Sequence, residues 1–225
     1  MIQKILDYIT NLPGYFQTSV ILMAIISIFA IIVGYLVSKL DAKAKPNLFM
    51  VGIISFIDMF NKFVKGHVGK NWKFLTPIVL TMAFYIAVSN LSGLVAVNSP
   101  TKFTAITFSL SITAFLVVQI TGFISQNWRH FLGVFKPFPF MFPLNLMGEF
   151  TPIISMALRL FGNIASGALI LTIVYRGAGW ISLLFTPFLH LLFDIAFGLI
   201  QTLVFVLLTV IFASQKIDEA DLEIE

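Results

Sequence analysis

The stretch PLNLMGEFTPIISMALRLFGNIASGALILTIVY, residues 143–175, is a long apolar run with one cation in its middle. Between Phe150 and Tyr175 the only charged side chain is Arg159. An arginine at the centre of a bilayer costs about 2.5–3.5 kcal/mol on insertion scales, so something must face the guanidinium. Asn163 follows one helical turn later on the same face. We therefore expect a membrane helix that presents a permanent positive charge.

The face around Arg159 is lined by small residues. Gly162 and Ser166 form a small-xxx-small step, which lets another helix approach closely. Arg159 has two interpretations: it marks a functional site, which is the default for an ionisable group inside a membrane, or it forms a structural ion pair with a carboxylate of the same protein. The cost of burying a permanent cation favours the functional interpretation.

The composition indicates a membrane protein. The chain has 225 residues, of which 59% are hydrophobic and 11% charged, whereas a soluble domain is about 25% charged. The absence of cysteine excludes a disulfide framework and thiolate metal sites, and we expect no metal and no cofactor. The net charge of +4 comes from basic residues in loops between apolar runs, so it indicates membrane topology rather than nucleic-acid binding.

The apolar runs predict an all-α polytopic membrane protein with one domain, five spans and an amphipathic interfacial helix. The expected spans are 18–38, 74–97, 102–125, 145–175 and 181–213, and the interfacial helix is 47–65. Helices over 149–175 and 181–213 would be about 40 and 50 Å long, whereas the hydrocarbon core is about 30 Å thick. We therefore expect these last two helices to be strongly tilted, with Pro152 and Pro187 as candidate kinks.

The distribution of basic residues predicts the orientation. Outside Arg159, ten Lys and Arg residues fall on one side of the expected spans and three on the other. The positive-inside rule then places the N-terminus outside and the C-terminus in the cytoplasm.

The last apolar run carries polar residues on one helix face. Their spacings of four, four and three residues align His190, Asp194, Gly198 and Gln201. Asp194 is the only acid in this run, and desolvation favours the neutral form of a lone carboxylate, so it could exchange a proton. The alternative is a structural salt bridge between Asp194 and Arg159, which would cancel the charge that the arginine presents.

The string Leu158–Asn163, LRLFGN, resembles the signature of subunit a of the F-type ATP synthases. The resemblance is strong between about 137 and 215, and it continues in order and spacing through PLNL (143–146), Glu149-Phe150-Thr151, Asp194, Gln201 and VFVLLT (204–209). The segment Asn90-Leu91-x-Gly93-Leu94 adds weaker support.

This resemblance implies a subunit that conducts protons, with sodium as the alternative ion, and that catalyses no reaction of its own. The last two helices would curve around a rotating ring of c subunits. The other partners would be the b-subunit stalk, the soluble ATPase sector and the lipid bilayer, without nucleic acid. The lead-in over 143–151 favours a bacterial plasma membrane over a mitochondrial inner membrane.

The resemblance also assigns roles to residues. Arg159 would separate two half-channels and ionise each arriving ring carboxylate. Asp194, with His190 as a helper, would load protons from the outside, and Asn163 and Gln201 would belong to the same pathway. Many family members carry Glu or His where this chain has Ala168, so we expect Asp194 to serve the outer half-channel alone.

Three further residues keep two interpretations each. Glu149 matches a family acid near the cytoplasmic end, so the resemblance implies a place on the exit path; the alternative is an ordinary acid at a helix N-terminus. Asn90 and Gln119 either form interhelical hydrogen bonds or lie on the proton path.

Other classes of membrane protein remain as alternatives. A secondary ion-coupled transporter is one, although the chain has no internal repeat of the kind such folds use. A haem cytochrome would need pairs of buried histidines, and of the three only His190 lies well inside a span. A purely structural subunit would not need Arg159.

Overall fold

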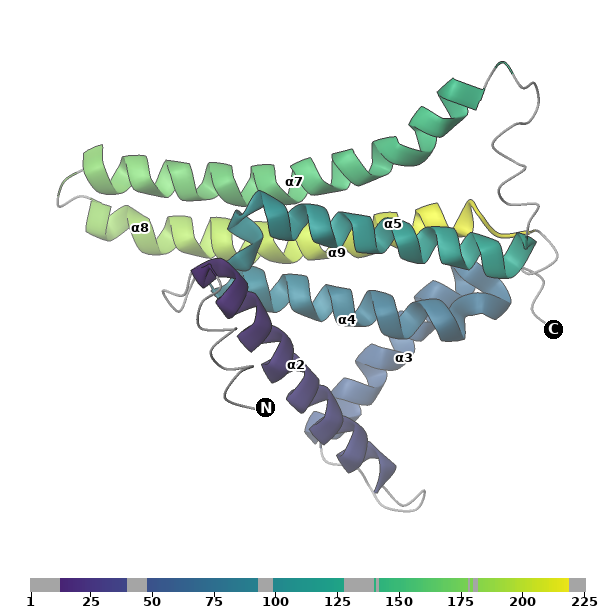
Figure 1. Ribbon diagram of the computed structural model, residues 1–225. Helices are drawn as coiled ribbons and strands as arrows, with labels where there is room; N and C mark the ends of the chain where they lie inside the picture. The colour runs from purple at the N-terminus through teal and green to yellow at the C-terminus, as the bar shows by residue number, and fades with distance from the viewer. Residues whose placement is uncertain are drawn as a thin grey trace, which may run out of the picture. The chain divides into compact units, whose positions relative to one another are not determined.

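The computed structural model of the chain describes residues 13–39, 48–92, 99–127, 140, 142–177, 179 and 182–218. Within these ranges the regular structure is entirely helical (Figure 1). Part of the expected second span, residues 93–97 with Gly93 and Leu94, lies outside the described residues.

Five stretches of the described chain are long and apolar enough to cross a membrane: Gly14–Ser38, Leu48–Leu91, Thr104–Gln126, Phe142–Gly177 and Thr186–Ser214. The expectation of an all-α polytopic membrane protein is thereby confirmed. The long helices within these stretches are α2 (Gly14–Ser38), α3 (Leu48–Val68), α4 (Trp72–Leu91), α5 (Thr104–Gln126) and α7 (Phe142–Gly177).

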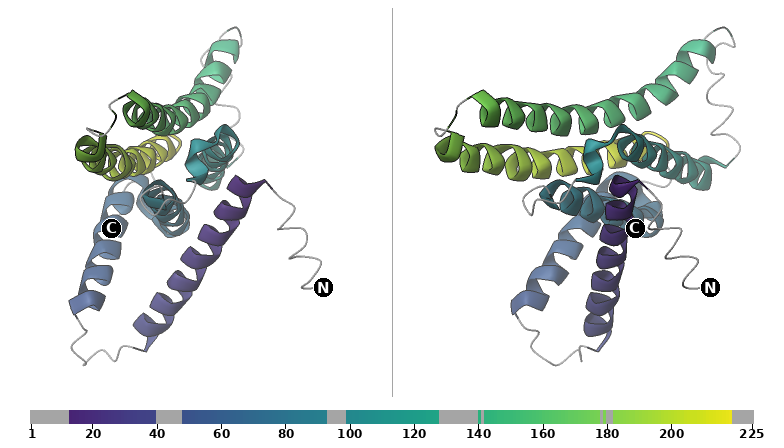
Figure 2. Two further views of the ribbon diagram at one scale, coloured as in Figure 1. Left: turned by 90° about the vertical axis from the view of Figure 1, so that its left-hand side faces the viewer. Right: turned by 60° about the vertical axis from the view of Figure 1, so that its left-hand side comes forward.

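The expected interfacial helix and the span after it are α3 and α4. They are joined only by the 3₁₀ turn η1, Gly69–Asn71. Gly69 has φ +58°, a left-handed conformation that glycine adopts without steric cost. The two helices leave this turn in different directions (Figures 1 and 2). A single glycine-containing turn therefore separates the amphipathic helix from the apolar one, and the interfacial position of α3 stays a prediction.

The last helical stretch is not uniform. It consists of α8 (Ser182–His190), a π-helical segment η6 (Leu191–Phe197) and α9 (Gly198–Ser214). Pro152 and Pro187 both lie inside helices, and the departure from α-helical geometry falls after Pro187, over η6. Short π-helical segments occur frequently at functional sites, and η6 contains Asp194.

The described residues form two compact units. The first unit is made of 1–24, 83–113 and 151–205, and the second of 25–82, 114–150 and 206–225. In the first unit, α7 runs beside α8, η6 and α9 (Figures 1 and 2). Gly167 permits the close approach, because a Cβ there would lie 3.2 Å from the Phe193 ring. The core of this unit includes Ile86, Leu160 and Phe205.

The second unit has its own buried apolar residues. They come from three stretches of the chain and include Val64, Val68, Leu75, Val79, Ala114, Val210 and Ala213. The turn after α9 also belongs to this unit, because Ile217 is buried and the backbone N–H of Asp218 donates to Oγ of Ser125 at 3.0 Å.

Candidate functional site

Arg159 lies on α7 with its side chain exposed. Its neighbours four residues away on the same helix face are the exposed polar residues Ser155 and Asn163, and the apolar side chains of Ile154 and Leu158 are exposed on adjoining faces of α7. Among the described side chains, Arg159 makes no hydrogen bond and no ion pair. Asp194 lies in η6, but its side chain is outside the described residues, so an Arg159–Asp194 ion pair stays an alternative hypothesis.

One helical turn after Arg159, Asn163 is joined to the last helix. Nδ2 of Asn163 donates to Oε1 of Gln201 at 2.7 Å. Gln201 is buried, whereas Asn163 is exposed on α7. The structure thus brings two of the predicted site residues together, across 38 residues of sequence.

Asn90 is the centre of a buried polar network. Its Nδ2 donates to the backbone oxygen of Gly198 at 3.1 Å, and its Oδ1 accepts from Oγ1 of Thr101 at 2.9 Å. Oγ of Ser99 lies 2.7 Å from Thr101 Oγ1 and donates to the backbone oxygen of Ser89. The interhelical hydrogen bond expected of Asn90 is therefore present, from α4 to the start of α9.

Gly198 lies at the point where Asn90 contacts the last helix. A Cβ at Gly198 would lie 3.0 Å from Cβ of Asn90, which is too close for an unshifted side chain. Thr101 belongs to η3 (Pro100–Lys102) in the connection to α5. Ser99 and Thr101 are not among the predicted site residues, and the two hydroxyl residues flanking Pro100 were the available signal.

A small cavity lies beside this network, within the first unit. Its volume is about 50 Å³. Its polar lining is Asn90, Ser99, Lys102, Asn163 and His190, and its other walls include Gly167, Ala168, Phe193 and Gly198. Since one water needs about 10–15 Å³ of such space, the cavity has room for about three to five waters. Three of the predicted site residues, Asn90, Asn163 and His190, therefore line one small cavity.

His190 has a partner that the sequence did not indicate. Oη of Tyr175 and Nε2 of His190 share a hydrogen bond of 2.9 Å, which joins the end of α7 to the end of α8. Tyr175 ends the apolar run, and its spacing gave no sign of this bond. His190 lines the cavity, and Tyr175 holds its ring from the end of α7.

Glu149, in the second unit, is held from two directions. Oε2 of Glu149 accepts a hydrogen bond of 2.8 Å from Nε2 of Gln119 on α5, and Oε1 forms an ion pair with Nζ of Lys216, which follows α9. The interpretation of Glu149 as a helix N-terminal acid is wrong, because α7 begins at Phe142 and its first turn contains no acid. Gln119 makes the interhelical hydrogen bond that was one of its two interpretations.

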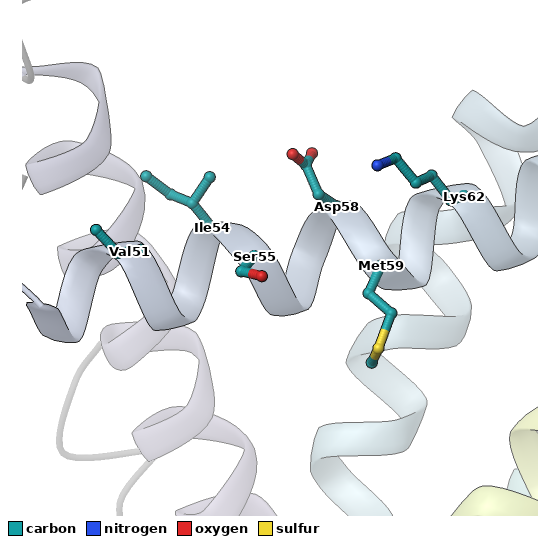
Figure 3. A pocket seen from close by; sticks show the side chains of 6 residues that line it. All are labelled: Val51, Ile54, Ser55, Asp58, Met59 and Lys62. Carbon is teal, nitrogen blue, oxygen red and sulfur yellow. The ribbon is translucent and has the colours of Figure 1, made fainter.

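A larger, open hollow lies along α3 (Figure 3). Its volume is about 480 Å³, and Val51, Ile54, Ser55, Asp58, Met59 and Lys62 line it. Asp58 and Lys62 project from the same side of the helix (Figure 3). No predicted site residue is among these lining residues. Among the described residues, no group of three or more His, Asp or Glu could hold a metal ion.

The long apolar helices define a multi-pass membrane protein. It carries a cation, Arg159, on the surface of α7, and polar groups around Asn90 inside the helix packing. The profile of the family described as ATP synthase A chain matches residues 18–214, and the chain belongs to that family.

Relatives named ATP synthase subunit a support this membership. The chain is 35% identical to the Mycoplasma pneumoniae protein over 174 residues, 63% of this chain and 58% of that one. The Desulfotalea psychrophila protein is 34% identical over 149 residues, 64% and 61% of the two chains. The Priestia megaterium protein is 31% identical over 225 residues, 89% and 92% of the two chains. The aligned region spans less than two thirds of the first two relatives and nearly all of the third.

Proposed function

We propose that this chain is the proton-translocating subunit of the membrane sector of an F-type ATP synthase. It would form two half-channels that load and unload the carboxylates of a rotating c-subunit ring. The observation that carries the proposal is Arg159: an exposed cation on an apolar stretch of α7, without a hydrogen bond or ion pair among the described side chains. Such a cation suits a partner that brings a carboxylate to it.

The apolar surface of the first unit supports a ring of helices as that partner. Large apolar side chains are exposed on the paired elements α7, α8, η6 and α9: Ile154, Leu158, Leu169, Ile173, Phe188, Leu199, Ile200 and Leu203. Exposed apolar surface of this kind fits lipid or another membrane helix. With Arg159 on the same helix as several of these residues, a passing carboxylate would meet one fixed positive charge on a largely apolar surface.

Arginine suits the role of a barrier between the half-channels. Its guanidinium cannot be deprotonated in proteins, so it cannot relay a proton across the membrane. A cation near the ring carboxylate favours the ionised carboxylate and release of the proton. Since one charge crossing the membrane is worth about 2.3 kcal/mol per 100 mV, a leak past Arg159 would remove most of the drive for rotation.

The small cavity supports an outer half-channel in the first unit. Water held by Asn90, Ser99 and His190 would carry a proton inward toward Asn163 and the Arg159 region. Asp194 lies on η6, four residues after His190. It would take up the proton and deliver it to a ring carboxylate. Gln201 would hold Asn163 in place through their hydrogen bond.

Glu149, with its donors Gln119 and Lys216, would serve the exit to the cytoplasm.

The setting would be a bacterial plasma membrane, with the N-terminus outside and the C-terminus in the cytoplasm. The c-subunit ring, the b-subunit stalk and the soluble ATPase sector would be the partners, and protons the ion, with sodium as the alternative. The alternative of a secondary transporter gains no support from the family match.

The decisive experiment replaces Arg159 by lysine in the assembled complex. Arg159→Lys should abolish proton-driven ATP synthesis, because an ammonium can lose its proton and lacks the planar guanidinium. The amount of assembled complex, measured by co-purification of the ring, should stay unchanged. Normal synthesis by Arg159→Lys would overturn the proposal.

A further inference from the structure

The carboxylate of Glu149 is held between donors from two different parts of the chain. Gln119, on α5, donates to one oxygen at 2.8 Å, and the ammonium of Lys216 pairs with the other. The side chains of Lys216 and Glu149 are 23% and 20% exposed, so the pair is largely shielded from solvent. Two donors acting on different oxygens fix both the position and the rotation of a carboxylate.

The backbone around Lys216 is itself anchored. Lys216 N donates to the backbone oxygen of Ala213 at 3.0 Å, in the turn that follows α9. Ile217 is buried, and the backbone N–H of Asp218 donates to Oγ of Ser125 on α5. The ammonium is therefore presented from a fixed turn, unlike the end of a long side chain on an open surface, where ion pairs contribute little.

We propose that Lys216 is a positioning residue, which holds Glu149 for proton transfer at the cytoplasmic end of the path. This inference rests on the proposed function. During synthesis, the O–H bond of a ring carboxylic acid breaks and its proton reaches a Glu149 oxygen through water, which leaves the ring acid as a carboxylate. The protonated Glu149 then gives this proton to cytoplasmic water and becomes a carboxylate again. Lys216 remains an ammonium throughout and takes no proton.

The test measures ATP-driven proton pumping by the whole complex in sealed vesicles. Lys216→Met should slow pumping between about 10- and 100-fold, the range expected when a reacting group is misplaced. Lys216→Arg should retain most of the rate, because it keeps the cation. The matched control is Lys73→Met, which removes an exposed lysine on α4 and should leave pumping unchanged. Wild-type pumping by Lys216→Met would overturn the inference.

A charge-swap variant distinguishes a positioning role of Lys216 from a purely structural ion pair. The double variant Glu149→Lys with Lys216→Glu keeps one ion pair between the same two positions, so the complex should assemble in normal amounts. It moves the carboxylate from α7 to the turn after α9, and pumping should stay as slow as in Lys216→Met. If the charge-swap variant pumps like wild type, the ion pair is only structural and the inference is wrong. This variant also decides the matter if Lys216→Met fails to assemble.

Arg159→Lys is measured in the same vesicles to separate the two proposals. If Arg159→Lys pumps normally, the proposed function itself fails. If Arg159→Lys is blocked while Lys216→Met pumps normally, only the role of Lys216 fails.

Discussion

Asn163 on α7 donates a hydrogen bond of 2.7 Å to Oε1 of Gln201 on α9. This bond joins the helix that carries Arg159 to the helix that follows Asp194. Because Gln201 is buried and Asn163 is exposed, the bond fixes one amide at the surface through another in the interior.

We predict that these two amides act as one unit. Asn163→Leu and Gln201→Leu should each slow ATP-driven proton pumping, and the double variant should be no slower than the worse single variant. Interhelical hydrogen bonds in membranes contribute about 0.6 kcal/mol on average and up to about 1.7 kcal/mol, which sets the expected coupling. The measurement is a double-mutant cycle on pumping rates. Effects that simply add would show that the bond has no functional role.

Gly198 should not tolerate a methyl group. In Gly198→Ala the new Cβ would meet Cβ of Asn90 at 3.0 Å, so Asn90 would have to move by a few tenths of an ångström, which weakens its hydrogen bonds to Gly198 and Thr101. We expect the free energy of unfolding to fall by about 1–3 kcal/mol, the usual cost of overpacking. Protease digestion of the purified complex at rising temperature would detect it. Gly34→Ala on α2 is the control, because a Cβ added there would meet no atom within 4 Å and stability should not fall.

Asp194 should be essential for proton uptake from outside, because Ala168 leaves the neighbouring wall of the cavity without an acid. Asp194→Asn should slow potential-driven proton uptake strongly, since an amide cannot release and regain a proton, whereas Asp194→Glu should keep partial activity. Ala168→Glu combined with Asp194→Asn should restore part of the flux, because position 168 lines the same cavity as Phe193, beside Asp194. If Asp194→Asn conducts like wild type, protons reach the ring by another route.

The last two helical stretches should lie far from the membrane normal. Helix α7 has 36 residues, and the stretch from Ser182 to Ser214 has 33. At 1.5 Å per residue they are about 54 and 50 Å long, against a hydrocarbon core of about 30 Å. Both should tilt by more than about 20°, the average for membrane helices. Polarised infrared spectroscopy or a structure of the complex in lipid can measure this, and tilts at or below the average would contradict the prediction.

Much of the architecture could be read from single segments of the sequence. Long runs without charge predicted the membrane helices, because a bilayer admits few charged side chains. Arg159 and Asn163 could be placed on one face of one helix, since their spacing of four residues is a property of the α-helix alone. The six-residue string around Arg159 was enough to identify the family that the profile match over 18–214 confirms.

Only the tertiary structure decided which residues of different helices lie opposite one another. Asn90 meets Gly198 across 108 residues, and Glu149 meets Lys216 across 67. In a soluble protein, the contrast between apolar core and water shows which face of a helix is buried. In a membrane helix both the lipid side and the packed side are apolar, so periodicity leaves the rotation of each helix open. The pairing of polar groups follows from that rotation, and so the partner of Glu149 and the cavity between Asn90 and His190 exist only in the folded chain.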